Sequence, residues 1–241
     1  MGSEKRRGDY KLSIIIPVHN EEKRLPNCLD CLLKFYDETM EAEIIVSEDG
    51  SIDDTFKIAE EYASRNVCVK VVHSEERLGK GGGIINGMQE AVGNLVVFMD
   101  VDLSTKPDQI SRLEKAIIEG ADLAVGSRSL PQSTITQSRS FTRKILAEGF
   151  NWLFRLFFQI QIRDTQCGFK MMKNEVSKEL MDKIEIKGFA FDVDLIVKAH
   201  DSGYKIREVP IIWSPVSGSK IRVNKQVLEM ARDLLKIWWH R

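Results

Sequence analysis

Short apolar runs alternate with amphipathic segments along the first half of the chain. Mostly apolar runs, typical of strands buried on both faces of a sheet, occur at residues 12–16, 44–46, 95–99 and 123–125, and residues 69–72 are strand-like. Apolar positions recur at helical spacing at residues 21–36, 51–65, 81–92 and 107–119, the last with Pro at its start. This alternation predicts an α/β fold, with a mainly parallel central sheet covered by helices on both faces.

The pattern changes after Arg128. A polar loop rich in Ser, Thr and Gln spans residues 131–140, and an unusually aromatic segment follows at 141–162, with five basic residues against one acid between 139 and 163. Residues 227–239 have helical spacing, and the stretch 218–241 carries six basic residues against two acids. Such basic, aromatic, amphipathic segments favour contact with an anionic membrane surface. Ordinary core helices with exposed arginines are the alternative.

Length and composition favour one large domain. The chain has 241 residues, of which 43% are apolar and 29% charged. We expect a flexible leader at 1–10, one α/β domain at 11–225 that includes the helices of 141–162, and a C-terminal amphipathic helix at 226–241. The net charge of −1 argues against a globally basic nucleic-acid binder.

Targeting signals and cysteines indicate the compartment. We find no apolar run of about 18 residues and no signal-peptide pattern, so we expect a cytosolic protein with reduced thiols. Cys28 and Cys31 form a C-x-x-C within a helical pattern. Helix packing is favoured over a redox or metal pair, because no second Cys/His pair lies nearby.

Polar clusters follow several of the predicted strands. They are Pro17–Glu22, Ser47–Ser51, Gly79–Gly83 and Asp100–Asp102. Ligands of open α/β sheets lie beyond the carboxyl ends of the strands, so these clusters are the candidate site.

Asp100 and Asp102 form a D-x-D directly after the strand at 95–99. Two hard carboxylates this close can share one divalent cation, and oxygen ligands suit Mg²⁺ or Mn²⁺ better than Zn²⁺. The alternative is a solvated acidic turn, because a lone D-x-D is common. The position of this D-x-D at the end of a strand favours the metal-binding interpretation.

The glycine cluster matches neither of two known phosphate-binding motifs. Ile84 stands where the dinucleotide fingerprint requires a small residue, and the P-loop pattern is absent. Glycines at a helix start still allow backbone N–H groups to approach a phosphate, and Lys80 adds positive charge. A flexible turn is the alternative.

Four ordered segments, PVHNEE, SEDGSIDDT, RLGKGGGIINGM and VVFMDVDLSTKP, together resemble the family 2 glycosyltransferases. Within that family the chain resembles the dolichyl-phosphate (polyprenyl-phosphate) hexosyltransferases, over roughly residues 11 to 225. The stretches VGSR, DTQCGFK, FDVDL and GSKI are also similar, and DTQCGFK most resembles the dolichyl-phosphate β-glucosyltransferases. The resemblance implies a glycosyltransferase-A type fold.

The resemblance also implies roles for individual residues. The nucleotide pocket would be lined by Pro17, Val18, Asn20, Glu21, Glu48, Asp49, Ser51, Lys80 and Val101. Within it, Asp49 would bind the nucleotide's uracil or guanine base, and Lys80 would lie near the diphosphate. Asp100 and Asp102 would hold the metal. Arg128 and Arg143 would bind the acceptor phosphate, and Arg222 is a further candidate. Asp164, Asp192 and Asp194 would assist or orient the sugar, although capping or packing explains Asp192 and Asp194 equally well.

The chain departs from the family pattern at two positions. The family often has two Asp where this chain has Glu48-Asp49, and a family serine appears here as Ala147.

The implied reaction is inverting transfer of a hexose from a nucleotide sugar to a polyprenyl or dolichyl phosphate. DTQCGFK favours UDP-glucose; GDP-mannose, another UDP-sugar or a non-lipid acceptor are alternatives. A lipid acceptor implies peripheral docking on the cytosolic face of a membrane through residues 141–162 and the C-terminal helix.

A sugar nucleotidylyltransferase is disfavoured, since no glycine-rich, arginine-containing loop follows the first strand. A non-catalytic nucleotide-sugar binder is disfavoured by the presence of Asp100, Asp102, Arg128 and Arg143. The sequence does not indicate the oligomeric state.

Overall fold

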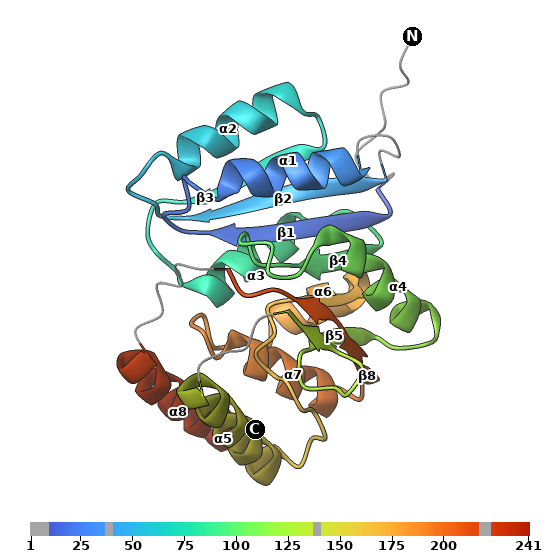
Figure 1. Cartoon of the computed structure of the whole chain (residues 1–241), viewed down its shortest axis with the longest axis vertical. Helices are drawn as coiled ribbons and strands as arrows, with labels where there is room; N and C mark the ends of the chain where they lie inside the picture. Colours follow the sequence, from blue (N-terminus) through green and yellow to red (C-terminus); the bar gives the residue numbers. More distant parts are fainter. Residues whose placement is uncertain (1–9, 37–40, 137–140, 217–222) are drawn as a thin grey trace.

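The structure is a computed structural model of the whole chain, and it describes residues 10–36, 41–136, 141–216 and 223–241. Side chains of residues 141–146 and 223–228 are not described. Among these residues, seven strands form one sheet in the order β3-β2-β1-β4-β7-β5-β8 (Figure 1). A short parallel pair, β6 with β9, forms a second sheet.

The strands that carry the longest apolar runs form the centre of the main sheet. Its members are β1 (Leu12–Val18), β2 (Ala42–Asp49), β3 (Val69–Ser74), β4 (Leu95–Phe98), β5 (Leu123–Ser127), β7 (Lys170–Lys173) and β8 (Ile206–Pro210). The short pair consists of β6 (Thr134–Ile135) and β9 (Ile212–Trp213). Every residue of β2 is buried, as expected for a strand covered on both faces.

Helices cover both faces of the sheet, so the predicted architecture is confirmed. The helices are α1 (Leu25–Tyr36), α2 (Thr55–Arg65), α3 (Lys80–Glu90), a 3₁₀ turn (Pro107–Gln109), α4 (Ile110–Ile118), α5 (Phe141–Phe158), α6 (Asn174–Met181), α7 (Phe191–Asp201) and α8 (Val223–Trp239). One core cluster joins α1, α2 and α4 to one face through alternate strand residues such as Ile14 and Ile16. The other joins α3, α5, α6, α7 and α8 to the opposite face, where Ile15 points.

The strand β7 runs against its neighbours. It pairs antiparallel with both β4 and β5, whereas the pairs β1–β2, β1–β4, β2–β3 and β5–β8 are parallel. Lys170 at the start of β7 lies opposite Phe98 near the end of β4 and Val125 in β5. The loop that enters β7 therefore reaches the same sheet edge as the carboxyl ends of the parallel strands.

The helices α5 and α8 lie side by side, farther from the sheet than α7 (Figure 1). Phe157 and Trp238 contact each other with ring centroids 5.8 Å apart. Arg241 donates a hydrogen bond to the carbonyl oxygen of Phe158 (3.0 Å). No helix among the described residues is long and apolar enough to cross a membrane.

Two predicted helices begin one turn later than expected. The first was expected from residue 21 and begins at Leu25; the second was expected from residue 51 and begins at Thr55. The residues between are held in loops by side chain-to-backbone bonds, because Thr55 Oγ1 accepts the Glu21 N–H (2.8 Å) and Glu48 accepts the Ser51 N–H (2.5 Å). The bond between Glu48 and Ser51 is local, and such bonds compete with helix formation. The bond between Glu21 and Thr55 instead joins two loops that are 34 residues apart.

Candidate active site

The predicted site residues gather at the carboxyl edge of the sheet. The loops after β1, β2, β4 and β5 carry Asn20, Ser51, Asp100 and Arg128, and the loop entering β7 adds Gly168 between the last two. This is the edge at which open α/β sheets bind ligands.

The loops after β1 and β2 are bonded to each other. Asn20 lies in the left-handed region (φ +55°), which Asn tolerates better than most residues. Its N–H donates to Ser51 Oγ (2.8 Å), and its side-chain oxygen accepts the Ile52 N–H (2.9 Å). Pro17 is half-buried in β1, whereas Val18 is buried in the core. Asn20 and Ser51 thus fix the rim of the expected nucleotide pocket.

Glu48 and Asp49 are buried and bonded within the protein. Glu48 accepts the Ser51 N–H and pairs with Nδ1 of His73 (2.6 Å). The Asp49 carboxylate accepts the N–H groups of Leu78 (2.6 Å) and Gly79 (2.9 Å). Gly79 has a φ of +92° and immediately precedes α3. Asp49 therefore holds the glycine loop at the start of α3; its predicted contact with the base stays a prediction.

Lys80 and Asp100 form an ion pair at the centre of this edge. Lys80 is the first residue of α3, and its Nζ lies 2.7 Å from Oδ1 of Asp100. Burial by itself lowers the pKa of Lys80, but the negative charges of Asp100 and Asp192 more than offset this and raise the pKa above the usual lysine value. Lys80 is therefore a permanent positive charge beside the D-x-D.

The backbone of Gly168 packs closely against this ion pair. A methyl group on its Cα would lie 2.7 Å from Nζ of Lys80 and would also overlap the Asp100 carboxylate. A larger residue at this position would force the ends of the Asp100 and Lys80 side chains to move.

Asp102 takes part in a tight turn after β4. Its Oδ1 accepts the Ser104 N–H (2.9 Å), and Val101 between the two acids is buried in the core. Among the described residues, no group of three or more His, Cys, Asp or Glu side chains is placed to hold a metal. A cation on Asp100 and Asp102 would thus need oxygen ligands from a bound substrate or water, and the hard carboxylates suit Mg²⁺ or Mn²⁺.

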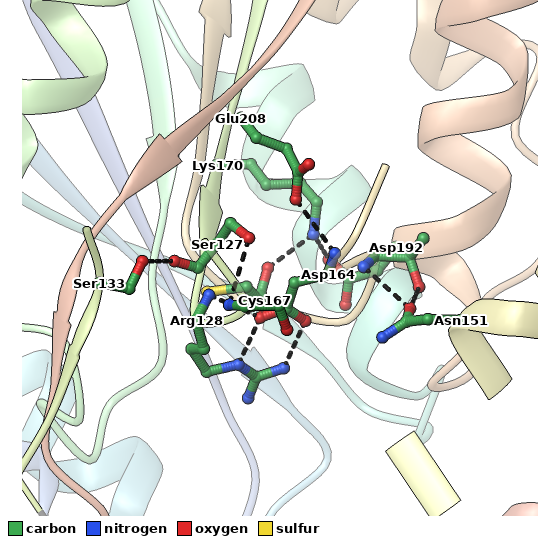
Figure 2. A network of polar contacts seen from close by, with 11 residues as sticks. Ser127, Arg128, Ser133, Asn151, Asp164, Cys167, Lys170, Asp192 and Glu208 are labelled. Carbon is green, nitrogen blue, oxygen red and sulfur yellow. Dashed lines mark hydrogen bonds and ion pairs between the residues drawn. The ribbon is translucent and has the colours of Figure 1, made fainter. Parts of the chain in front are cut away.

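Arg128 is held by Asp164 through a bidentate pair (Figure 2). Nε donates to Oδ2 (2.6 Å), Nη2 donates to Oδ1 (2.7 Å), and the Arg128 N–H also donates to Oδ2 (2.9 Å). The guanidinium lies 5.6 Å from the ring centroid of Trp213. Burial lowers the pKa of Arg128, but the charge of Asp164 outweighs burial and raises it, so the guanidinium stays charged.

The loop 164–168 is fixed along its length (Figure 2). Glu208 on β8 accepts the Asp164 N–H (3.1 Å), and Asn151 on α5 accepts from Thr165 Oγ1 (2.9 Å). The ammonium of Lys170, fully buried, donates to the Cys167 carbonyl oxygen (2.6 Å) and pairs with Asp192. The loop is therefore a rigid part of the site.

Asp192 and Asp194 have structural partners. Asp192 at the start of α7 neutralises Lys170. Asp194 accepts the N–H groups of Glu185 (2.8 Å) and Ile186 (3.0 Å), and burial raises its pKa in spite of those bonds. These contacts favour the packing interpretation for both residues.

Two hollows are relevant to the location of the site. A small one is lined by Asp100, Ser104, Thr105, Arg128, Gly168 and Trp213, together with Cys167 and Phe169. A larger one of about 600 Å³ lies between α8 and the segment 185–189, and it contains none of the predicted site residues. The small hollow is the candidate active site, because the predicted acidic residue Asp100 and the predicted basic residue Arg128 both line it.

Some predictions fall on residues without a described side chain. The 1–10 leader lies outside the described residues except for Tyr10, and Arg222 and the GSKI stretch (218–221) lie outside them completely. Arg143 belongs to the first turn of α5, where only the backbone is described. Their roles stay predictions, as do the domain boundaries.

The four cysteines form no disulfide. All four cysteines, each within the described residues, are free thiols, and Cys28 is buried in the core as helix packing predicts. Cys167 lines the small hollow, and burial raises its pKa to about 12, so it stays a neutral thiol.

The sequence missed Trp213 and Glu208. Trp213 comes from β9, a strand of only two residues, and Glu208 from β8, in which Arg207, Glu208 and Pro210 interrupt the apolar residues. The only signal for Trp213 is an aromatic residue at the end of the apolar stretch 209–213, which does not identify its partner.

Solved structures of one enzyme, in complexes with UDP or UDP-glucose, have the same fold. Glucosyl-3-phosphoglycerate synthase from Mycobacterium tuberculosis, in complex with UDP, superposes with a TM-score of 0.72 at 19% identity, over 95% of this chain and 80% of that one. The same enzyme with Mn²⁺, UDP and phosphoglyceric acid gives 0.71 at 19% identity, over 95% and 77%. This likeness confirms the expected glycosyltransferase-A fold.

The chain belongs to glycosyl transferase family 2, whose family model matches residues 13–181. It is accordingly a glycosyltransferase. It is 36% identical to the dolichyl-phosphate beta-glucosyltransferase of Drosophila melanogaster, over 95% of this chain and 74% of the relative. Identity to the protein of the same name from Homo sapiens is 32%, over 94% and 74%. It is also 30% identical to glycosyltransferase AglD of Haloferax volcanii, over 95% of this chain but 37% of that protein.

Proposed function

We propose that this glycosyltransferase transfers glucose from UDP-glucose to a dolichyl or polyprenyl phosphate, with inversion, at the cytosolic face of a membrane. The observation that carries the proposal is the small hollow, in which Asp100 and Arg128 line one space. A site for a metal-bound diphosphate and a site for an anionic acceptor thereby adjoin each other. The relatives that bear the name dolichyl-phosphate beta-glucosyltransferase supply the substrate class.

The donor side consists of Asp100, Asp102 and Lys80. The two carboxylates would hold Mg²⁺ or Mn²⁺, which when bound supplies positive charge that stabilises the leaving diphosphate. The M. tuberculosis enzyme of the same fold has been solved with Mn²⁺ and UDP-glucose, which supports this choice. Lys80 adds a positive charge at the start of α3, where backbone N–H groups also favour anions.

The acceptor side consists of Arg128, with Arg143 and Arg222 as further expected phosphate ligands. A phosphate monoester has a second pKa of about 6, so near neutral pH it is largely a dianion. Such a nucleophile has no proton to lose, and it requires orientation rather than a general base. The Asp164 carboxylate fixes the guanidinium of Arg128 for that purpose.

The reaction then balances without proton transfer. One acceptor phosphate oxygen forms a bond to the anomeric carbon of glucose, and the bond from that carbon to the diphosphate oxygen breaks. The electron pair leaves with UDP. Attack from the opposite side converts the α-linked donor into a β-linked product.

The helices α5 and α8 are the proposed membrane-docking surface. Exposed apolar side chains gather on them: Trp152, Leu153, Leu156, Leu235, Trp238 and Trp239. Trp239 is 81% exposed, which is costly in water but favourable at the headgroup level of a bilayer. The four free cysteines agree with a reducing, cytosolic location.

The activity is tested by transfer of radioactive sugar into organic-extractable product. Purified protein with Mn²⁺ and dolichyl phosphate is given UDP-glucose or, in parallel, GDP-mannose. We expect label from UDP-glucose only, and a β-anomeric product by NMR. Transfer from GDP-mannose alone would overturn the assignment of UDP-glucose as the donor. Transfer only to a water-soluble acceptor would overturn the assignment of a lipid phosphate as the acceptor.

Membrane docking is tested by flotation with vesicles containing phosphatidylserine. We expect the protein to float, and Trp239→Ser combined with Leu235→Ser to reduce the bound fraction at least about tenfold. Val67→Ser is the matched control, because Val67 is 95% exposed but precedes β3, outside the proposed docking surface. Equal flotation of both variants, or none for the wild type, would contradict the docking surface.

A further inference from the structure

The Lys80 ammonium lies against the Asp100 carboxylate, one of the two proposed to hold the divalent cation. Its Nζ lies 2.7 Å from Oδ1 of Asp100, and the Asp100 side chain is 44% exposed on the remaining side. A carboxylate oxygen with a lysine at this distance is already neutralised. A metal ion that arrives alone must bind next to that positive charge or displace it.

The space around the pair limits where the ammonium can go. The backbone of Gly168 closes one side so tightly that even a methyl group would overlap both partners. Asp192, which also attracts Lys80, is already paired with the buried Lys170. The remaining direction is toward the solvent, where the Lys80 side chain is 22% exposed.

We infer that Lys80 is a positioning residue that couples metal binding to nucleotide binding. Without nucleotide it competes with the divalent cation for Asp100. A nucleoside diphosphate provides phosphate oxygens that attract the ammonium away from Asp100, and the same oxygens complete the coordination of the metal. The inference rests on the proposed metal site at Asp100 and on a nucleoside diphosphate as the donor's leaving group.

Linkage makes the coupling reciprocal. If the diphosphate raises the affinity for the metal, the metal raises the affinity for the diphosphate by the same factor. A site of this kind takes up the metal and the nucleotide together and holds neither strongly alone. It also keeps Asp100 paired in the absence of substrate.

The test measures Mn²⁺ binding directly, by the loss of the free Mn²⁺ signal in electron paramagnetic resonance, with and without UDP. For the wild type we expect weak Mn²⁺ binding that UDP strengthens at least about a hundredfold. For Lys80→Met we expect Mn²⁺ alone to bind about tenfold more tightly, because the competing charge is gone. The increase in Mn²⁺ affinity that UDP causes is smaller in this variant, because the ammonium no longer contacts the diphosphate.

Two controls separate competition from a general change of charge. Lys106→Met removes an exposed positive charge four residues after Asp102, with no contact to Asp100, and should leave Mn²⁺ binding within about twofold. Lys80→Arg keeps the charge and should bind Mn²⁺ alone no more tightly than the wild type. Melting temperatures measured on the same samples establish that each variant is folded.

Unchanged or weaker Mn²⁺ binding by folded Lys80→Met would overturn the inference, as would equal tightening by Lys106→Met. If Lys80→Met does not fold, Lys80→Arg decides, because tighter metal binding with the charge retained excludes competition. Lys80→Met could bind Mn²⁺ more tightly while no protein binds UDP. That result would uphold the competition at Asp100 and overturn the assignment of a UDP-sugar as the donor. An absence of Mn²⁺ binding in all proteins would overturn both the inference and the proposed metal site.

Discussion

Arg128 and Asp164 face each other through two hydrogen bonds, although 36 residues separate them in the sequence. The pair connects the end of β5 to the loop entering β7 and fixes a guanidinium at the small hollow. A side chain held in this way loses little conformational freedom when an anion binds.

Asp164→Asn should damage acceptor use more than donor use. The amide keeps the size of the side chain but loses the charge and one of the two acceptor oxygens, so Arg128 is less firmly placed. We expect the KM for dolichyl phosphate to rise about tenfold while the Kd for UDP, measured by calorimetry, stays within about twofold.

Glu119→Gln is the control for Asp164→Asn, because Glu119 also pairs with an arginine, Arg207, but on an exposed surface. It should behave as the wild type. An unchanged acceptor KM in Asp164→Asn would remove Asp164 from the positioning of Arg128.

Arg143→Ala should raise the acceptor KM or lower kcat with little effect on UDP binding, if Arg143 binds the acceptor phosphate. Arg155→Ala, on the same helix, serves as the matched loss of charge. Steady-state kinetics with varied dolichyl phosphate check this expectation. Identical kinetics for Arg143→Ala and the wild type would contradict the role.

Asp102→Ala should abolish metal-dependent turnover while the protein stays folded. Asp102 bonds only one described backbone group, the Ser104 N–H, so its removal costs about 1 kcal/mol of stability. Turnover with Mn²⁺ and the melting temperature are measured together, with Asp108→Ala as an exposed acidic control on the 3₁₀ turn. Full turnover in Asp102→Ala would exclude Asp102 from the metal site.

Gly168→Ala should lower turnover at least about tenfold, because the added methyl overlaps Asp100 and Lys80 and must displace one of them. Gly149→Ala is the matched control: nothing lies within 4 Å of a methyl group there, and the residue is in α5. We expect that variant to keep its turnover and to gain up to about 1 kcal/mol of stability. The initial rate at saturating donor distinguishes the two, and equal rates would show that the loop yields easily.

Lys170→Met should destabilise the fold by about 3–5 kcal/mol, because Asp192 would be left buried without its cation. The double variant Lys170→Met, Asp192→Asn should recover part of that loss. Urea unfolding measures both. Lys183→Met breaks an exposed pair with Glu179 and should cost at most about 1 kcal/mol; a similar loss from Lys170→Met would mean that the buried pair contributes little.

The sequence predicts the strands of the first half well, because they are short, mostly apolar runs rich in β-branched residues. It does not predict β7, since Lys170 and Lys173 interrupt the apolar pattern. A lysine at a fully buried strand position is possible only because Asp192, from α7, neutralises it. That partner lies 22 residues away, and no local pattern connects the two.

The candidate site was predictable in its parts but not in its pairings. Asp100 and Lys80 were both expected near the diphosphate, yet nothing in their spacing indicates that they pair with each other. Asp49 was expected to contact the nucleotide base, and the structure adds two hydrogen bonds from the backbone of the glycine loop to its carboxylate. Such contacts depend on how loops from different strands meet, which is decided by the tertiary fold.

The position of β7 sets the spacing of the two halves of the site. Neighbouring strands lie about 4.8 Å apart, so β4 and β5, with β7 between them, are separated by about 10 Å. The loop that carries Asp100 and the loop that carries Arg128 thus leave the sheet two strands apart, and under the proposed function the leaving diphosphate and the acceptor phosphate would meet the anomeric carbon between them. Changes in loop length elsewhere would leave this separation of the two strand ends unchanged.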